Sequence, residues 1–123
     1  MRMTEPDPAA GGMSVGSSRL DGVAVVTLGG ELDLANAALL REQLQDEISA
    51  HDLPVVLDLS GVTFMDSTAL GVLVRIRKLL GAEGRAFRVA CPTPSTRRLF
   101  TITGLVEALG VHDTVADALA SIT

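Results

Sequence analysis

The sequence has no tryptophan and no tyrosine, and its only aromatic residues are three phenylalanines. Proteins that bind single-stranded nucleic acid stack bases on aromatic side chains, and this sequence has almost no side chains that could do so. Positive charge is also scarce, because ten Lys and Arg stand against fifteen Asp and Glu and leave a net charge of −5. This charge has the wrong sign for binding a phosphate backbone. The composition therefore argues against nucleic acid as a direct partner.

Cysteine, histidine and long apolar runs are rare as well. The single cysteine, Cys91, can form neither an intramolecular disulfide nor a cysteine-based zinc site, and we expect it to be a small buried hydrophobe. His51 and His112 lack the spacing of metal ligands, and each is expected at the surface near the end of an element. The apolar residues never run for about 18 positions without a charge, so no membrane insertion is expected.

The start of the chain differs in composition from the rest. Residues 1–12 combine proline, glycine and acidic side chains, and they lack the positive start and apolar stretch of a secretory signal. We expect them to form a disordered N-terminal extension, and Met13 is a second candidate for the translation start. Because 47% of all residues are hydrophobic, residues 13–123 can bury one core and are expected to form one domain of a cytoplasmic protein.

Strand and helix patterns alternate from residue 13 onward. β-Branched and aliphatic runs bounded by glycine or proline predict three strands, and the segment before the first of them is expected to complete a hairpin. Apolar residues spaced three and four positions apart predict helices. The expected strands are 14–20, 23–28, 55–59 and 87–91, and the expected helices are 36–50, 67–80, 95–101 and 113–122.

This order of elements predicts an α/β fold. Strand–helix–strand units with short connections place their strands parallel and cover the sheet with helices. We therefore expect a mixed, mostly parallel sheet of four to five strands with about four helices. The N-terminal hairpin would supply an antiparallel edge strand.

The segment 62–71 carries the most informative chemistry. It follows a buried strand and opens a helix, which is where open α/β sheets carry functional loops. Asp66, Ser67 and Thr68 bring a carboxylate and two hydroxyls to the helix N-terminus, and helix capping alone would explain these residue types. A phosphate on Ser67 would instead face the free N–H groups of the helix and add about −1.5 to −2 charges beside Asp66. Both interpretations stay open at this point.

The sequence gives little support for an enzyme. A nucleophilic Ser67 would need a base and an orienting group, and neither histidine is expected at the carboxyl end of a strand. The G-x-S-x-G, P-loop, G-x-G-x-x-G and H-E-x-x-H motifs are absent. Glu31 and Asp33 could form an acidic rim around Ser67 together with Asp66, but a solvated loop is favoured over a metal site. No metal and no cofactor is expected.

Three segments, in order, resemble the STAS domain family and in particular the bacterial anti-sigma factor antagonists. Residues 30–33 resemble the family's G-E-L/I-D element, and residues 64–71 resemble its F/Y-M/L-D-S-S/T-G-L-G element. Residues 98–105 resemble a third element, R-L-F-x-x-S/T-G-L, and the likeness extends over residues 13–121. Ala69 stands where the family usually carries glycine, and its methyl group could crowd the backbone of a partner. The resemblance implies a single STAS-like domain.

The resemblance also implies a regulatory binding protein. Antagonists of this family bind an anti-sigma factor that is also a serine kinase, and they thereby release a sigma factor. The kinase phosphorylates the serine after the central aspartate, which corresponds to Ser67, and a serine phosphatase restores the protein. An exposed Met65 or Leu70 would supply the apolar contact. The implied partner-binding residues are Asp33, Met65, Asp66, Ser67, Thr68 and Leu70.

A second interpretation belongs to another class of protein. A stand-alone STAS subunit can serve a membrane lipid-transport ABC complex, and Ser67 would then be only a helix cap and an interface residue. A binding module that is never phosphorylated is a third interpretation. The intact segments 66–68 and 98–105 favour the antagonist.

Overall fold

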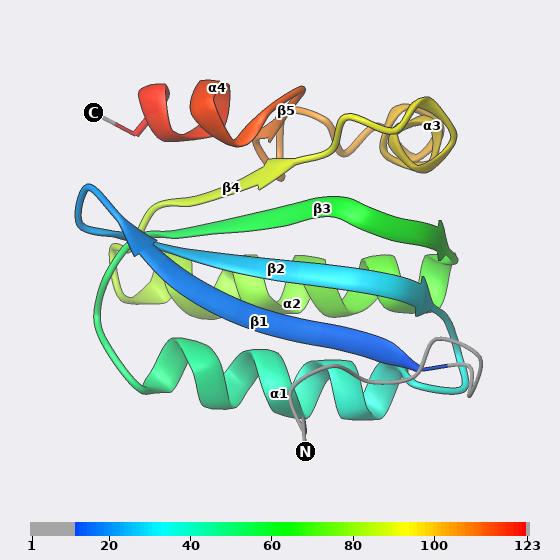
Figure 1. Ribbon diagram of the computed structural model, residues 1–123, viewed down its shortest axis with the longest axis horizontal. Helices are drawn as coiled ribbons and strands as arrows, with labels where there is room; N and C mark the ends of the chain where they lie inside the picture. Colours follow the sequence, from blue (N-terminus) through cyan, green and yellow to red (C-terminus); the bar gives the residue numbers. More distant parts are fainter. Residues whose placement is uncertain (1–11, 123) are drawn as a thin grey trace, which may run out of the picture.

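A computed structural model describes residues 12–122, so the disorder predicted for residues 1–12 lies outside the described part except at Gly12. Five strands and four helices follow one another along this range, as Figure 1 shows. The strands are β1 (Met13–Leu20), β2 (Val23–Leu32), β3 (Val55–Met65), β4 (Phe87–Ala90) and β5 (Val111–His112), and the helices are α1 (Ala37–Ser49), α2 (Ser67–Ala82), α3 (Pro94–Thr103) and α4 (Val115–Ala120).

The strands form one sheet in the order β1-β2-β3-β4-β5. β1 pairs antiparallel with β2 through the hairpin, while the pairs β2–β3, β3–β4 and β4–β5 are parallel. The fold is therefore a mixed, mostly parallel α/β sheet with four helices, which confirms the predicted class. Parallel pairing brings the carboxyl ends of β2, β3 and β4 to the same end of the sheet.

Two strands are longer than the sequence pattern predicts. β2 continues through Gly29 and Gly30, and β3 continues through Gly61, although these glycines were expected to end the strands. The pairing of β2 with β3 shifts register between Thr27 and Gly29 and again after Gly30, so the glycines mark irregularities inside the ladder. As a consequence, residues 62–65 belong to a strand and not to a loop.

The sheet is buried on both faces in its centre. Figure 1 shows α1 and α2 together on one face, where they cover the larger core, and α4 on the opposite face. Val55, Val56 and Leu57 are all fully buried, as expected of a parallel strand covered on two sides. The smaller core on the α4 face contains Val23, Val25, Val56, Ala90 and Ala118.

The structure corrects one prediction about a polar residue and confirms one about cysteine. The His51 side chain is only 6% exposed, although it was expected at the surface. Polar partners reduce the cost of burying it, because the Leu53 amide donates to its Nδ1 at 3.1 Å and the Arg85 guanidinium lies 3.1 Å from the same atom. His112 is half-buried in β5, and Cys91 is buried as predicted.

The last helix begins slightly later than predicted and has a different cap. The Thr114 hydroxyl accepts a hydrogen bond from the Asp117 amide at 3.0 Å, which makes Thr114 the N-cap of α4. Asp113, the expected cap, forms an ion pair with Arg97 instead. Within residues 12–122, none of the helices has both the length and the apolar character needed to span a bilayer.

Candidate functional site

The site forms where β2 and β3 end side by side. Leu32 and Met65 are partners in the parallel ladder, so the loop that leaves β2 meets the start of α2. The Asp66 amide donates to the Leu32 carbonyl at 3.1 Å, and the Leu34 amide donates to Asp66 Oδ2 at 3.0 Å. These two bonds join segments that are more than thirty residues apart in the sequence.

Asp66 also begins the helix that carries the predicted phosphoacceptor. Its extended backbone makes it the N-cap of α2, and its Oδ1 accepts a hydrogen bond from the Ala69 amide at 3.0 Å. Both carboxylate oxygens of Asp66 are thus bonded to backbone amides. Asp66 positions the surrounding loops, and this geometry makes it a positioning residue more than a free docking group.

Ser67 is exposed in the first turn of α2. Its hydroxyl has no hydrogen-bond partner among residues 12–122, because the capping role belongs to Asp66. Thr68 is exposed beside it. Capping therefore explains Asp66 but does not explain Ser67, whose side chain is exposed to solvent.

Asp33 lies in the turn between β2 and α1 and is half-buried. Its Oδ1 accepts hydrogen bonds from the amides of Ala35 at 3.0 Å and Asn36 at 3.3 Å. The β2–β3 pairing brings this turn next to Asp66, so acidic groups do adjoin the Ser67 loop. In the described part of the chain no group of three or more acidic, histidine or cysteine side chains could hold a metal ion.

The prediction that Met65 or Leu70 is exposed is wrong. Met65 is 7% exposed and Leu70 is 3% exposed, and both belong to the larger core. Because β3 continues to Met65, neighbouring side chains alternate between faces and Phe64 points outward at 50% exposure. Leu34, in the loop bonded to Asp66, is 74% exposed. Leu34 and Phe64 are the exposed apolar residues of the site, and the sequence reasoning missed both.

The family difference at Ala69 has no effect on the surface. Ala69 is completely buried, and its methyl group belongs to the larger core. The expectation that it would crowd a partner's backbone is therefore wrong.

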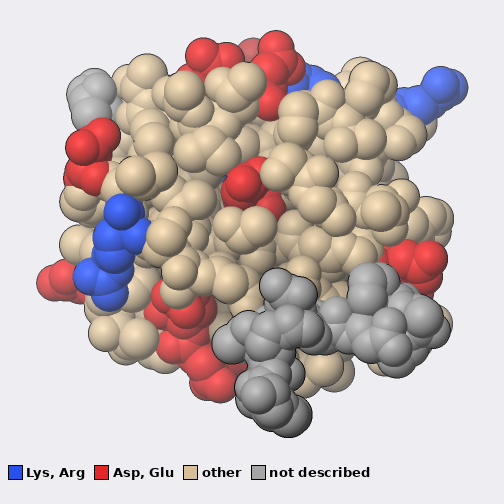
Figure 2. All heavy atoms as spheres, viewed as in Figure 1, with Lys and Arg blue, Asp and Glu red and all other residues tan. Residues whose placement is uncertain are grey.

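The third motif, residues 98–105, covers the second half of α3 and the two residues after it, and α3 follows β4. Its Phe100 is fully buried, and Gly104 ends the helix with a left-handed backbone (φ 72°) that glycine adopts without strain. Figure 1 shows α3 near the end of the sheet where β2 and β3 finish. Ile102, on its outer side, is 70% exposed. The face drawn in Figure 2 is mostly uncharged, with separate acidic groups and few cations.

Fold and site together define a mixed α/β domain with an exposed serine in the first turn of a helix and exposed apolar residues beside it. The family model described as "STAS domain" matches residues 17–118, and the chain belongs to this family.

Named relatives support the same family. The chain is 32% identical over 102 residues to the anti-sigma F factor antagonist of Paenibacillus polymyxa, covering 82% of this chain and 87% of the relative. It is 33% identical over 102 residues to the anti-sigma-F factor antagonist RsfB of Mycobacterium tuberculosis, covering 83% of each. A crystal structure of an anti-sigma factor antagonist from Mycobacterium paratuberculosis superposes with a TM-score of 0.81 at 32% identity, over 89% of this chain and 93% of that one.

Proposed function

We propose that this protein is an anti-sigma factor antagonist whose binding is controlled by phosphorylation of Ser67. It binds an anti-sigma factor that is also a serine kinase, and this binding releases a sigma factor. Phosphorylation of Ser67 ends the interaction, and a serine phosphatase restores it. The observation that carries the proposal is the exposed Ser67 hydroxyl, which has no bonding partner among residues 12–122 and is presented at the start of α2.

The surroundings of Ser67 suit a switch that depends on charge. Exposed Leu34 and Phe64 offer apolar contact area to a partner while Ser67 is neutral. A phosphate adds about −1.5 to −2 charges next to Asp66, in a contact region from which a partner would exclude water. Lowering the bound fraction from 99% to 1% requires about a 10⁴-fold change in affinity, or about 5.5 kcal/mol.

The residues implied as partner-binding take two different parts in this proposal. Ser67 and Thr68 contact the partner directly, together with the apolar pair just named. Asp33 and Asp66 hold the two loops in place through their backbone hydrogen bonds. The remaining two residues, Met65 and Leu70, support the loops from inside the core.

Three variants test the switch against the cognate kinase. With ATP, the wild type is expected to gain one phosphate on Ser67, and Ser67→Ala is expected to gain none. Ser67→Asp should bind the kinase at least about tenfold more weakly than Ser67→Ala, by isothermal titration calorimetry. Thr68→Ala removes the neighbouring hydroxyl and should still be phosphorylated on Ser67. Equal affinity of the Ala and Asp variants would exclude the switch.

The partner recovered from the native cell tests the class of function. Recovery of a histidine-kinase-like anti-sigma factor is the expected outcome of co-purification. Recovery of a transporter ATPase would instead support the subunit of a lipid-transport complex. A mass increase of one phosphate, located on Ser67 in the native protein, would exclude a module that is never phosphorylated.

A further inference from the structure

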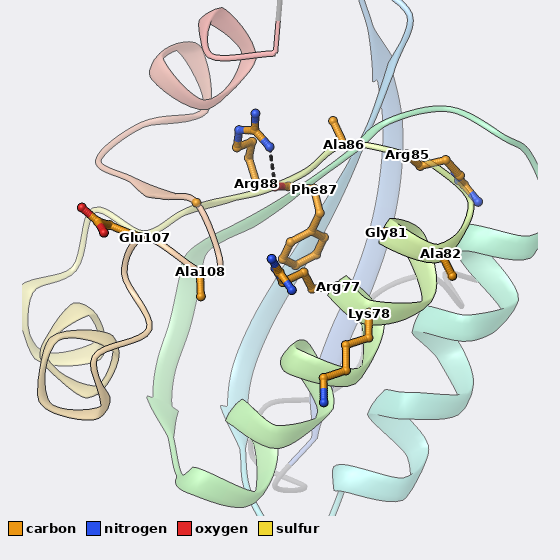
Figure 3. A pocket seen from close by; sticks show the side chains of 11 residues that line it. Arg77, Lys78, Gly81, Ala82, Arg85, Ala86, Phe87, Arg88, Glu107 and Ala108 are labelled. Carbon is orange, nitrogen blue, oxygen red and sulfur yellow. Dashed lines mark hydrogen bonds between the residues drawn. The ribbon is translucent and has the colours of Figure 1, made fainter.

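A hollow of about 730 Å³ lies at the end of α2 that is farther from Ser67. It is bounded by the second half of α2, the start of β4 and the segment before β5 (Figure 3). The hollow borders the part of β4 that has no partner in β5, because β5 is only two residues long and pairs with Val89 and Ala90 alone. Its volume is within the range of small-molecule binding sites.

Positive charge gathers around this hollow. Four of the chain's ten Lys and Arg line it, and Glu107 is the one carboxylate that shares the lining. The chain as a whole carries a net charge of −5, so this concentration of cations is local. Clefts lined by one sign of charge raise the local concentration of ions of opposite sign.

Two of the four cations already serve the fold. Arg85 donates to the carbonyls of Leu53 at 2.9 Å and Ile48 at 2.8 Å, which ties it to the end of α1, and it also forms an ion pair with Glu83 at 3.0 Å. Arg88 projects from the side of β4 opposite to Phe87, as Figure 3 shows, and donates to Ser121 Oγ at 2.9 Å.

The other two cations, Arg77 and Lys78, are exposed on α2. Neither forms an ion pair or a hydrogen bond with any residue in the range 12–122. They do not cap the helix either, since the last turn of α2 contains no basic residue and the Leu80 carbonyl accepts the Arg85 amide at 2.9 Å. Their charges are therefore available to a ligand.

We propose that this hollow binds a small organic anion that carries two or more phosphate or carboxylate charges, held by Arg77 and Lys78. The concave shape and the limited volume favour a small molecule over an extended polyanion, which the acidic remainder of the surface would repel. Arg77 lies ten residues from Ser67 along α2, or about 15 Å. The binding site is thus separate from the partner surface and does not depend on the proposed switch.

Backbone amide NMR of the full chain tests the proposal with inorganic phosphate, pyrophosphate and citrate, at ionic strength held constant with chloride. We expect shifts confined to residues 77–88 and 107–110, and tighter binding of pyrophosphate or citrate than of phosphate. A response to pyrophosphate alone assigns a phosphate ligand, and a response to citrate alone assigns a carboxylate ligand. If none of the three anions shifts the amide signals of these residues, the proposal is overturned.

Matched variants separate a built site from general attraction. The double variant Arg77→Gln/Lys78→Gln should weaken binding at least about tenfold, while Glu107→Gln should tighten it about twofold. Arg19→Gln/Arg41→Gln removes the same charge from exposed positions outside the hollow and should leave the affinity within about twofold. An equal loss in both double variants would overturn the proposal. Phosphorylation of Ser67 is measured in a separate experiment, so a negative result for anion binding would not contradict the proposed phosphorylation switch.

Discussion

The two carboxylate oxygens of Asp66 accept hydrogen bonds from different parts of the chain, one from the Ala69 amide in α2 and one from the Leu34 amide after β2. One side chain therefore sets both the start of the helix and the position of the neighbouring loop. Ser67 is held at the surface by this arrangement without taking part in it.

Removing the Asp66 carboxylate should destabilise the protein measurably. Asp66→Ala loses an N-cap and a second backbone acceptor, so we expect the free energy of unfolding to fall by about 2 kcal/mol. Asp66→Asn keeps one acceptor oxygen and should lose about half as much. Urea unfolding measures both. Equal stability of Asp66→Ala and the wild type would contradict the double role of this carboxylate.

Cys91 gives a prediction for alkaline pH. Burial raises the pKa of its thiol above the ordinary value, so the unfolded chain releases the thiol proton at lower pH than the folded chain does. The contribution of Cys91 to stability is complete below the ordinary thiol pKa and is lost as pH rises through the folded pKa. Urea unfolding between about pH 8 and pH 10 should show a smaller decline for Cys91→Ala than for the wild type. An identical decline in the free energy of unfolding for both proteins would contradict this role of Cys91.

Within β2, one glycine allows the neighbouring strand to approach closely. Gly30 has a positive φ of 83°, and a Cβ there would lie 2.5 Å from the Gly12 carbonyl oxygen and 3.2 Å from Met13 Cα. Only glycine allows β1 to approach β2 this closely at the position where the ladder changes register. The strand then delivers Leu32 to its partner Met65.

Gly30→Ala should therefore be clearly destabilising. The strained backbone alone costs about 1–2 kcal/mol, and the contact with the Gly12 backbone adds to this cost. Gly16→Ala is the matched control in β1, because a Cβ at Gly16 meets no atom within 4 Å and its φ is not positive. Its free energy of unfolding should change by less than about 1 kcal/mol. Urea unfolding compares the two variants, and similar losses would contradict the argument.

The whole molecule assembles the candidate partner surface from segments that are distant in the sequence. Leu34 comes from the loop after β2, Phe64 from the end of β3 and Ser67 from the start of α2, and parallel pairing brings all three to one end of the sheet. Leu34 and Phe64 are exposed there, while Met65 and Leu70 support the same surface from the core.

This separation of surface and core predicts different effects of truncation. Leu34→Ala and Phe64→Ala should each weaken binding to the partner kinase about tenfold or more and change the free energy of unfolding by less than about 0.5 kcal/mol. Met65→Ala should instead lower the free energy of unfolding by about 2–5 kcal/mol. Calorimetric binding and urea unfolding measure the two quantities. Wild-type affinity in both Leu34→Ala and Phe64→Ala would contradict the proposed surface.

Local sequence pattern predicted the order and type of every element except the two-residue β5, because periodicity and turn residues act over a few neighbouring positions. The apolar run at 55–59 predicted the central strand, and the spacing of apolar residues predicted α1 and α2. The motif around Ser67 also marked the candidate site, since helix-opening residues after a buried strand form a local signal. The family followed from three such local motifs.

The surroundings of each side chain in the site depend on tertiary contacts. The local pattern predicted that the strand ends at Gly61, but pairing with β2 extends β3 to Met65. Because of this extension, the Met65 side chain points into the core and the Phe64 side chain points to the surface. Tertiary contacts also bring the Leu34 amide to the Asp66 carboxylate and form the hollow beside the two-residue β5. Exposure depends on which distant segments cover a residue, and that covering exists only once the chain has folded.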